Sequence, residues 1–237
     1  MEPGEYALMD EAEGGMWWYR ALHARLRAAL SDIDGPILDA GCGTGGLLAG
    51  MSGLDCFGLE YDGSAARRAA EKSGARIAGG SINAMPFAAA SFAAVVSADV
   101  LCHAGVDPSA ALAELHRVLR PSGRLVLNMP AYAWLASAHD RQVHNARRTT
   151  ARALRADLLA AGFTNVRTRY WNTLLLPLMI IQRKLLARAE AKSDVAAFSP
   201  WLDATLFAIT DMERRLACPF FAGGSILAVA ERPKDFT

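Results

Sequence analysis

Short apolar runs alternate with longer amphipathic stretches over the first 130 residues of the chain. Five runs have the length of buried strands, at residues 37–40, 56–60, 75–78, 92–97 and 124–128. Between them lie stretches with helical spacing, at residues 45–51, 64–72 and 110–119. Gly74 and Pro121 are expected to stop the last two of these helices. Strands that alternate with helices in this way predict parallel strand–helix–strand units joined by right-handed crossovers.

The pattern changes on either side of this stretch. A helix is expected after Gly14-Gly15 and through about Leu30, with Trp18 and Leu22 on one face. A polar and aromatic loop spans residues 131–149, and loops of that length in compact domains are usually functional. Later elements are expected at residues 150–161 (helix), 166–171 (strand), 172–191 (helix), 201–216 (helix) and 226–231 (strand). Pro177 should kink the third of these or delay its start.

Composition narrows the class of protein. Hydrophobic residues make up 52% and charged residues 21%, so a sizeable core is available. The net charge of +1 gives no electrostatic reason to expect a nucleic-acid partner. The four cysteines lack CxxC spacing, which fits a reducing cytosol better than a disulfide framework. The N-terminus has no signal-peptide pattern, and the longest apolar run falls well short of the roughly 20 residues that a membrane span needs. We therefore predict a cytoplasmic protein.

A glycine-rich loop, residues 41–46, directly follows the first predicted strand. Glycines let the backbone turn sharply and approach a ligand, and the next helix presents free N–H groups. The spacing G-x-G-x-x-G, with Glu60 after the second strand, is typical of dinucleotide sites. The spacing D-x-G-x-G-x-G, which begins at Asp39, is the alternative. We favour the second pattern, because Asp39 would repel a pyrophosphate but suits a ligand with a free ammonium group.

The second pattern resembles motif I of class I S-adenosylmethionine-dependent methyltransferases. The resemblance extends over residues 35–130. Within this stretch the sequence resembles the UbiE/methyltransferase-11-like subgroup at Met85-Pro86-Phe87, at residues 99–103 (DVLCH) and at residues 114–123 (ELHRVLRPSG). It implies S-adenosyl-L-methionine as cofactor and S-adenosyl-L-homocysteine as product. Ser81 stands where the family usually has Asp. The resemblance implies these cofactor-binding residues: Trp18, Tyr19, Asp39, Gly41, Cys42, Gly43, Gly45, Glu60, Tyr61, Ser81, Ile82 and Asp99.

Two further stretches resemble related bacterial enzymes. Residues 17–20 (WWYR) are similar to a WWFR segment whose helix closes over the methionine end of the cofactor, with packing of the rings on the core as the alternative. Residues 137–148 are similar to an SxHD…HxRR stretch. The substrate residues expected there and nearby are Tyr132, Asp140, Arg147 and Arg148. An exposed helix start is the other interpretation of the two arginines.

Methyl transfer from a sulfonium mainly needs in-line positioning and exclusion of water. A hydroxyl or ammonium acceptor must also lose a proton, and histidine suits that task near neutral pH. The candidate catalytic residues are His103, His139 and His144. A metal site at His139, Asp140 and His144 is a weaker alternative, and we predict no metal.

These inferences predict a single methyltransferase domain over residues 1–237, with an α/β fold built on a Rossmann-like, doubly wound, seven-stranded and mostly parallel sheet. Its expected parts are an N-terminal cap helix, a cofactor-binding half, a helical substrate cap, and a last strand with a tail, at residues 1–34, 35–130, 131–225 and 226–237.

The expected reaction is methyl transfer to a small-molecule or lipid-linked acceptor. A non-catalytic S-adenosylmethionine-binding protein and an NAD-dependent oxidoreductase are the alternatives. Residues 173–191 combine an apolar face with a basic shoulder, which predicts core or dimer packing or, alternatively, peripheral contact with a membrane. The sequence leaves the oligomeric state open.

Overall fold

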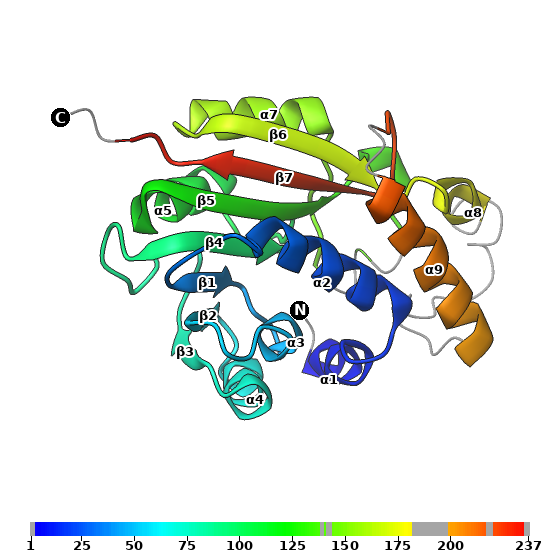
Figure 1. The fold of residues 1–237 in the computed structure, drawn as a ribbon, viewed down its shortest axis with the longest axis horizontal. Coiled ribbons are helices and arrows are strands. Elements are labelled where there is room, and N and C mark those ends of the chain that lie inside the picture. The colour runs from blue at the N-terminus through cyan, green and yellow to red at the C-terminus, as the bar shows by residue number, and fades with distance from the viewer. Residues whose placement is uncertain (1–2, 138–139, 141–143, 182–198, 217–219, 235–237) are drawn as a thin grey trace.

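A seven-stranded sheet runs through the middle of the molecule (Figure 1). The computed structural model describes residues 3–137, 140, 144–181, 199–216 and 220–234. The strands lie in the order β3-β2-β1-β4-β5-β7-β6. Their bounds are β1 Ile37–Ala40, β2 Cys56–Glu60, β3 Arg76–Gly79, β4 Phe92–Ala98, β5 Leu119–Pro130, β6 Thr164–Trp171 and β7 Ser225–Glu231. Only β7 runs antiparallel to its neighbours, so the predicted Rossmann-like, mostly parallel sheet is confirmed.

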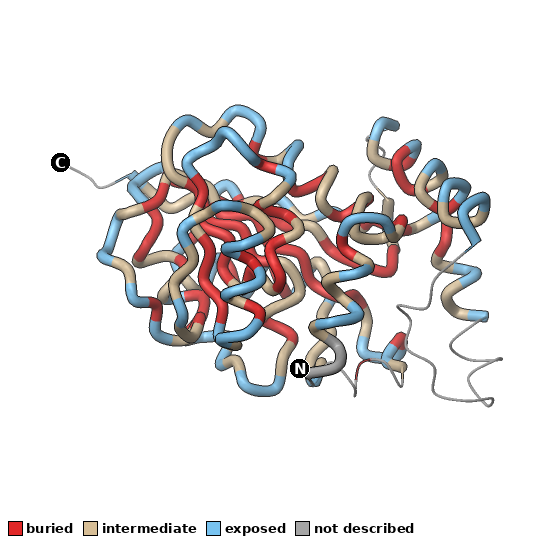
Figure 2. The backbone as a smooth tube through the Cα atoms, turned by 90° about the horizontal axis from the view of Figure 1, so that it is seen from below, coloured by how far each residue is buried: buried red, intermediate tan, exposed pale blue. Residues whose placement is uncertain are grey.

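Helices cover both faces of the sheet. One face packs against α5 (Pro108–Val118) and α7 (Ala151–Ala160), and the other against α2 (Trp17–Leu30), α3 (Gly46–Ala49) and α4 (Gly63–Ser73). Successive strand residues point to opposite faces, so Leu125 and Leu127 join the first core and Val126 the second. Figure 2 shows that buried residues concentrate in these central strands. The continuous apolar runs in the sequence follow from burial on both faces.

Local signals set the ends of the covering helices. Asp62 caps α4 by accepting hydrogen bonds from Ser64 N and Ala65 N, both at 2.9 Å. Gly74 ends that helix in a left-handed conformation, as predicted. Asp107 and Thr150 cap α5 and α7 in the same way as Asp62 caps α4.

The structure differs from the sequence predictions at several elements. Helix α1 (Pro3–Ala12) was not predicted. The helix expected at 45–51 is only α3. Strand β5 is longer than the predicted 124–128, because its first residue, Leu119, pairs with Phe92 of β4 and its end pairs with β7 up to Pro130. Within the predicted helix 172–191, α8 (Leu176–Ile181) starts late, with Pro177 in its first turn. Residues 182–191 lie outside the described residues.

The C-terminal helix α9 (Pro200–Leu216) packs against α2. Asp203 accepts hydrogen bonds from Trp17 N and Arg20 Nη2, each at 2.6 Å. Leu206 is buried in this interface, whereas Leu216 is exposed, so the apolar stripe of the helix covers the core only along part of its length. In the described part of the chain, no helix combines the length and apolarity that crossing a bilayer requires.

Candidate functional site

One cavity of about 750 Å³ opens at the carboxyl ends of β1, β2 and β4, where open α/β sheets place their ligands. It extends from α1, over the glycine loop, to α8 and the start of β7. Most predicted site residues line it: Trp18, Tyr19, Asp39, Gly41, Cys42, Gly43, Glu60, Tyr61, Ser81, Ile82, Asp99, His103, Asp140, His144 and Arg148. Residues from widely separated parts of the sequence therefore meet in one space.

The backbone of the glycine loop is held against β2. Gly41 N and Cys42 N both donate to Leu59 O, at 2.8 and 3.0 Å. Gly43 N donates to Glu60 Oε2 at 2.9 Å. Gly45 has a different role from the one predicted. It does not line the cavity, and a Cβ there would lie 2.8 Å from Ala69 Cα, so the glycine permits close packing of the loop on α4.

Three carboxyl groups gather at this end of the cavity. Asp39 and Glu60 come from the ends of β1 and β2, and Glu13 follows α1; all three are buried. Burial, with Glu13 and Glu60 nearby, raises the pKa of Asp39 to about 8. Glu60 is held by Tyr6 Oη at 3.1 Å and by Asp62 N at 3.0 Å. A cationic ligand would be stabilised by these carboxyl groups, and its charge would favour the ionised form of Asp39.

Helix α1 supplies the site residues that the sequence analysis missed. Tyr6, Met9 and Glu13 line the cavity. Glu13 accepts hydrogen bonds from Thr44 Oγ1 at 2.7 Å and from Lys72 Nζ at 2.8 Å, which ties α1 to the glycine loop and to α4. The acidic composition of residues 10–13 was the only signal, and it does not by itself indicate a helix.

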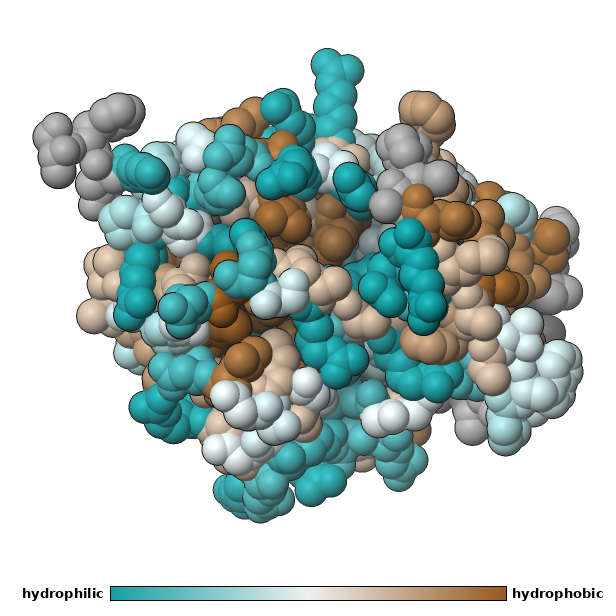
Figure 3. Space-filling model, in the orientation of Figure 1, coloured by the Kyte–Doolittle hydropathy of each residue, from teal (hydrophilic) through white to brown (hydrophobic). Residues whose placement is uncertain are grey.

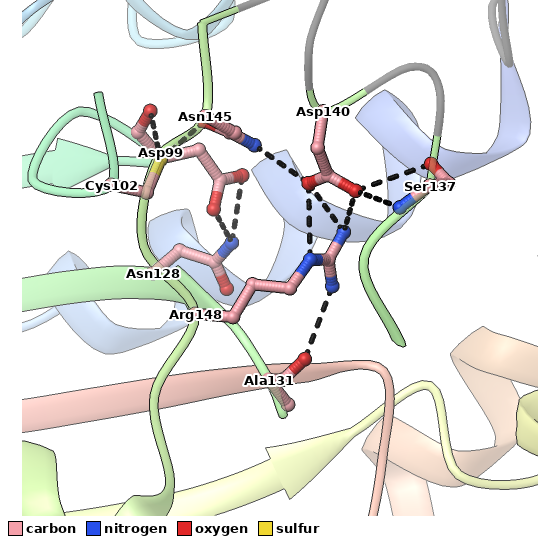
Figure 4. Close-up of polar contacts among 8 residues, drawn as sticks. All are labelled: Asp99, Cys102, Asn128, Ala131, Ser137, Asp140, Asn145 and Arg148. Atoms are coloured by element: carbon pink, nitrogen blue, oxygen red, sulfur yellow. Dashed lines mark hydrogen bonds and ion pairs between the residues drawn. The ribbon is translucent and has the colours of Figure 1, made fainter. Parts of the chain in front are cut away.

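The other end of the cavity carries a polar network around Asp99 and Arg148 (Figure 4). Arg148 donates to both Asp140 oxygens, at 2.7 and 3.0 Å, and to Ala131 O at 3.1 Å. Burial would raise the pKa of Asp140, but Arg148 holds it below its ordinary value. Asn128 Nδ2 donates to both Asp99 oxygens at 3.0 Å. Burial raises the pKa of Asp99 to about 7.

The remaining predicted residues fall into two groups. His103 and His144 line the cavity, while His139 lies outside the described residues. Tyr132 and Arg147, which were predicted as substrate residues, do not line the cavity. The Tyr132 ring stacks on Tyr170 with centroids 5.3 Å apart, and Arg147 Nη1 donates to His103 O at 2.6 Å. Both side chains therefore contact other parts of the protein instead of the cavity.

Two of the cysteines, Cys42 and Cys102, lie in or beside the cavity and are buried. Cys42 lines the cavity, and burial with Asp39 and Glu60 nearby raises the pKa of its thiol. Cys102 Sγ contacts Asn145 Oδ1 at 2.8 Å, and burial raises its pKa as well. Both thiols stay protonated near neutral pH, so neither acts as a nucleophile. Among the described residues, no group of His, Cys, Asp and Glu side chains is arranged to hold a metal ion.

Comparison with known proteins gives the family context. Residues 38–127 match the family model described as a methyltransferase domain. An uncharacterized methyltransferase of Bacillus subtilis is 33% identical over 120 residues, which cover 48% of this chain and 49% of that protein. The chain thus spans about half the length of the curated relatives it matches.

Solved structures extend the likeness to the whole fold. An S-adenosylmethionine-dependent methyltransferase from Thermotoga maritima has a TM-score of 0.63 at 14% identity, covering 97% of this chain and 95% of that one. Phosphoethanolamine N-methyltransferase 2 of Haemonchus contortus, in complex with S-adenosyl-L-methionine, has a TM-score of 0.61 at 18% identity, covering 92% and 53%. Over residues 38–127 the chain is therefore similar to methyltransferase domains, and its whole fold is that of S-adenosylmethionine-dependent methyltransferases.

Proposed function

We propose that this protein transfers a methyl group from S-adenosyl-L-methionine to a small-molecule or lipid-linked acceptor. The observation that carries the proposal is a single cavity with a glycine loop and three buried carboxyl groups at one end and a separate polar compartment at the other. A cofactor and an acceptor can thus meet above the carboxyl ends of the strands.

The proposed cofactor position follows from the charges. Asp39, with Glu13 behind it, would bind the ammonium group of the cofactor, and Glu60 the ribose hydroxyls through charge-assisted hydrogen bonds. Ser81 and Ile82 line the side of the cavity where adenine would lie. When bound, the cofactor supplies the electrophilic sulfonium methyl group, and the chain supplies orientation and a water-poor site.

The same charges oppose a dinucleotide. A pyrophosphate at the glycine loop would lie beside three buried carboxyl groups, would be repelled by those that are ionised and would raise the pKa of Asp39 further. The Gly43 N–H, which a dinucleotide fingerprint would aim at phosphate, already donates to Glu60. The oxidoreductase alternative is correspondingly disfavoured.

Calorimetric titration with S-adenosylmethionine, S-adenosylhomocysteine and NAD(H) tests the cofactor. We expect the first two ligands to bind and both Asp39→Ala and Glu60→Ala to weaken them. The matched control is Asp55→Ala, because Asp55 is an exposed acid just before β2 that pairs only with the surface Arg76 among the described residues. Binding of NAD(H) alone, or of no ligand, would refute the proposal.

The lipid-linked version of the acceptor rests on the surface beside the cavity. Met179 of α8 lines the cavity, while Leu178 and Ile181 of the same helix are exposed. Figure 3 shows hydrophobic side chains gathered at the end of the molecule that carries α8 and α9. The basic shoulder at residues 183–188 lies outside the described residues.

Two measurements separate the acceptor classes. Transfer of labelled methyl groups from the cofactor into the organic phase of a cell extract is expected for a lipid-linked acceptor, and into the aqueous phase for a small polar one. Flotation with anionic liposomes tests peripheral membrane contact. Absence of co-migration at low salt would remove that part of the proposal.

A further inference from the structure

The carboxyl groups of the cavity form two electrostatic groups. The pKa of Asp39 responds to burial, Glu13 and Glu60. The pKa of Asp99 responds to burial, Asn128, Arg148 and Asp140 instead. The contacts agree: Cys102 Sγ contacts Asp99 O at 3.0 Å and Asn145 Oδ1 at 2.8 Å, and Asn145 Nδ2 donates to Asp140 Oδ1 at 3.3 Å. Asp99, which the family resemblance had implied as a cofactor ligand, therefore lies with the acceptor end of the cavity.

Asp99 is held rigidly by the end of β5. Its backbone N–H donates to Asn128 O at 3.0 Å, and Asn128 Nδ2 donates to both of its carboxyl oxygens. The Asn128 amide can point only one way, because Trp171 Nε1, which is solely a donor, donates to Asn128 Oδ1 at 2.8 Å. Asp99 also has a positive φ of 53°, an uncommon conformation that clusters at functional sites.

The positive charge nearest to Asp99 is already neutralised. Arg148 is buried, forks onto Asp140 and gives its remaining terminal nitrogen to Ala131 O. A phosphate or carboxylate on the acceptor would have to displace Asp140 from this pair. The compartment therefore fits a neutral or cationic acceptor group better than an anionic one.

We propose that Asp99 binds the methyl-accepting hydroxyl or amine and takes its proton. This inference rests on the proposed methyl transfer. The acceptor oxygen or nitrogen forms a bond to the methyl carbon, the carbon–sulfur bond breaks, and its electron pair stays on sulfur to give S-adenosylhomocysteine. The proton of the acceptor moves to the Asp99 carboxylate. Asn128 is the positioning residue, and Trp171 fixes its orientation.

The groups around Asp99 set its pH behaviour. Arg148 and Asp140 face it from the loop after β5, and Cys102 and His103 follow it in the chain; His144 lines the same cavity. Burial raises the pKa of Asp99 to about 7, so the fraction of the carboxyl group that can accept a proton grows as the pH rises through that value. Removing the Asn128 donor would raise the pKa further, because the amide stabilises the charged form.

Sinefungin tests the proposal without knowledge of the acceptor. In this cofactor analogue an amine on carbon stands where the transferred methyl group would be. We expect calorimetry to show sinefungin binding about tenfold more tightly than S-adenosylhomocysteine at pH 8, since its ammonium would meet Asp99. Asp99→Asn should bring this ratio close to one while changing S-adenosylhomocysteine affinity less than about threefold. The ratio should rise with pH through about 7 in the native protein and stay flat in the variant.

Two further variants test whether the preference for sinefungin depends on the charge of Asp99. Asn128→Ser should keep the preference but shift its midpoint to higher pH, which a merely structural role would not do. Asp55→Asn, which removes an exposed carboxylate outside the cavity, should leave the ratio unchanged. An equal loss of both ligands in Asp99→Asn, or a ratio insensitive to it, would overturn the inference while leaving methyl transfer standing. If neither ligand binds the native protein, the proposed function itself fails.

Discussion

At the scale of single residues, the charge state of Asp39 is expected to have the largest effect on cofactor affinity. The Asp39→Asn substitution should lower the affinity for S-adenosylhomocysteine about 10- to 100-fold, since it removes a charged hydrogen bond to the ammonium group. In the native protein affinity should rise from pH 6 to about 8, as Asp39 loses its proton, and fall above that as the α-amino group of the ligand loses its own. Titration calorimetry across this range checks the limb below pH 8, which the variant should lack. An unchanged slope would contradict the assignment.

Arg148 and Asp140 form a buried ion pair, and replacing either residue alone should destabilise the fold. Arg148→Met should lower the free energy of unfolding by about 3–5 kcal/mol, because Asp140 would stay buried without its partner. The double variant with Asp140→Leu should lose less than the sum of the two single losses, as denaturant unfolding would show. Arg76 and Asp55 are the exposed comparison pair, whose removal should cost less than about 1 kcal/mol. Additive losses at the buried pair would contradict this coupling.

Residue-level prediction from the sequence was most specific where a motif is local. The positions of Asp39, Gly41 and Glu60 in the cavity wall follow from two strand ends and one loop. The engagement of Arg148 by Asp140 could not be foreseen, because two polar neighbours in a loop do not show which of them face each other. The packing role of Gly45 was equally hidden, since it depends on how closely α4 approaches.

At the scale of elements, α1 is fastened over the glycine loop by charges from α4. Lys72 pairs with Glu13 and Asp10, and Arg68 Nε contacts Asp10 Oδ2 at 2.8 Å. We expect Lys72→Met to loosen α1, which should appear as faster amide exchange in residues 3–12 and about five- to tenfold faster release of S-adenosylhomocysteine. High salt should act in the same direction, because the partly exposed pairs are screened.

The control for this latch lies on the same helix. Arg67 is exposed on α4, and its replacement by Met changes the net charge equally while leaving the contacts of α1 intact. Amide exchange and release rates should therefore match those of the native protein. If Lys72→Met and Arg67→Met behave alike, α1 is not held by these ion pairs.

Helices and strands with a strong hydrophobic pattern were predicted closest to their observed positions. The strands buried on both faces and the capped helices α4 and α5 appear close to their predicted positions. Helix α1 lacks a strong apolar stripe and is held by charged contacts to a distant helix, so its sequence carries little signal. The position of β7 between β5 and β6 is likewise a matter of long-range pairing that no local pattern contains.

At the scale of the whole molecule, the buried carboxyl groups of Asp39 and Asp99 make the stability of the unliganded protein depend on pH. The folded-state pKa values of Asp39 and Asp99, about 8 and about 7, lie above the ordinary value of 3.8. Through these two acids the folded state binds more protons than the unfolded state between about pH 4 and pH 8, so their contribution to stability falls as pH rises through that window. His23 acts oppositely up to about pH 6.5, because burial lowers its pKa from 6.5 to about 4. Asp140 and Asp211, whose pKa values are lowered, act oppositely and lose their contribution only as pH falls below about 4.

Thermal unfolding from pH 5 to pH 8, with and without S-adenosylhomocysteine, tests this balance. The melting temperature of the unliganded protein should decline from about pH 6.5 to pH 8, where His23 no longer offsets the two acids, and Asp39→Asn should flatten part of the decline. Bound ligand should raise the melting temperature more at pH 8 than at pH 5, because its ammonium group supplies the counter-charge that ionised Asp39 lacks and because only the folded state binds it. A ligand effect that is equal at both pH values would show that the buried carboxyl groups do not couple the cofactor to the stability of the fold.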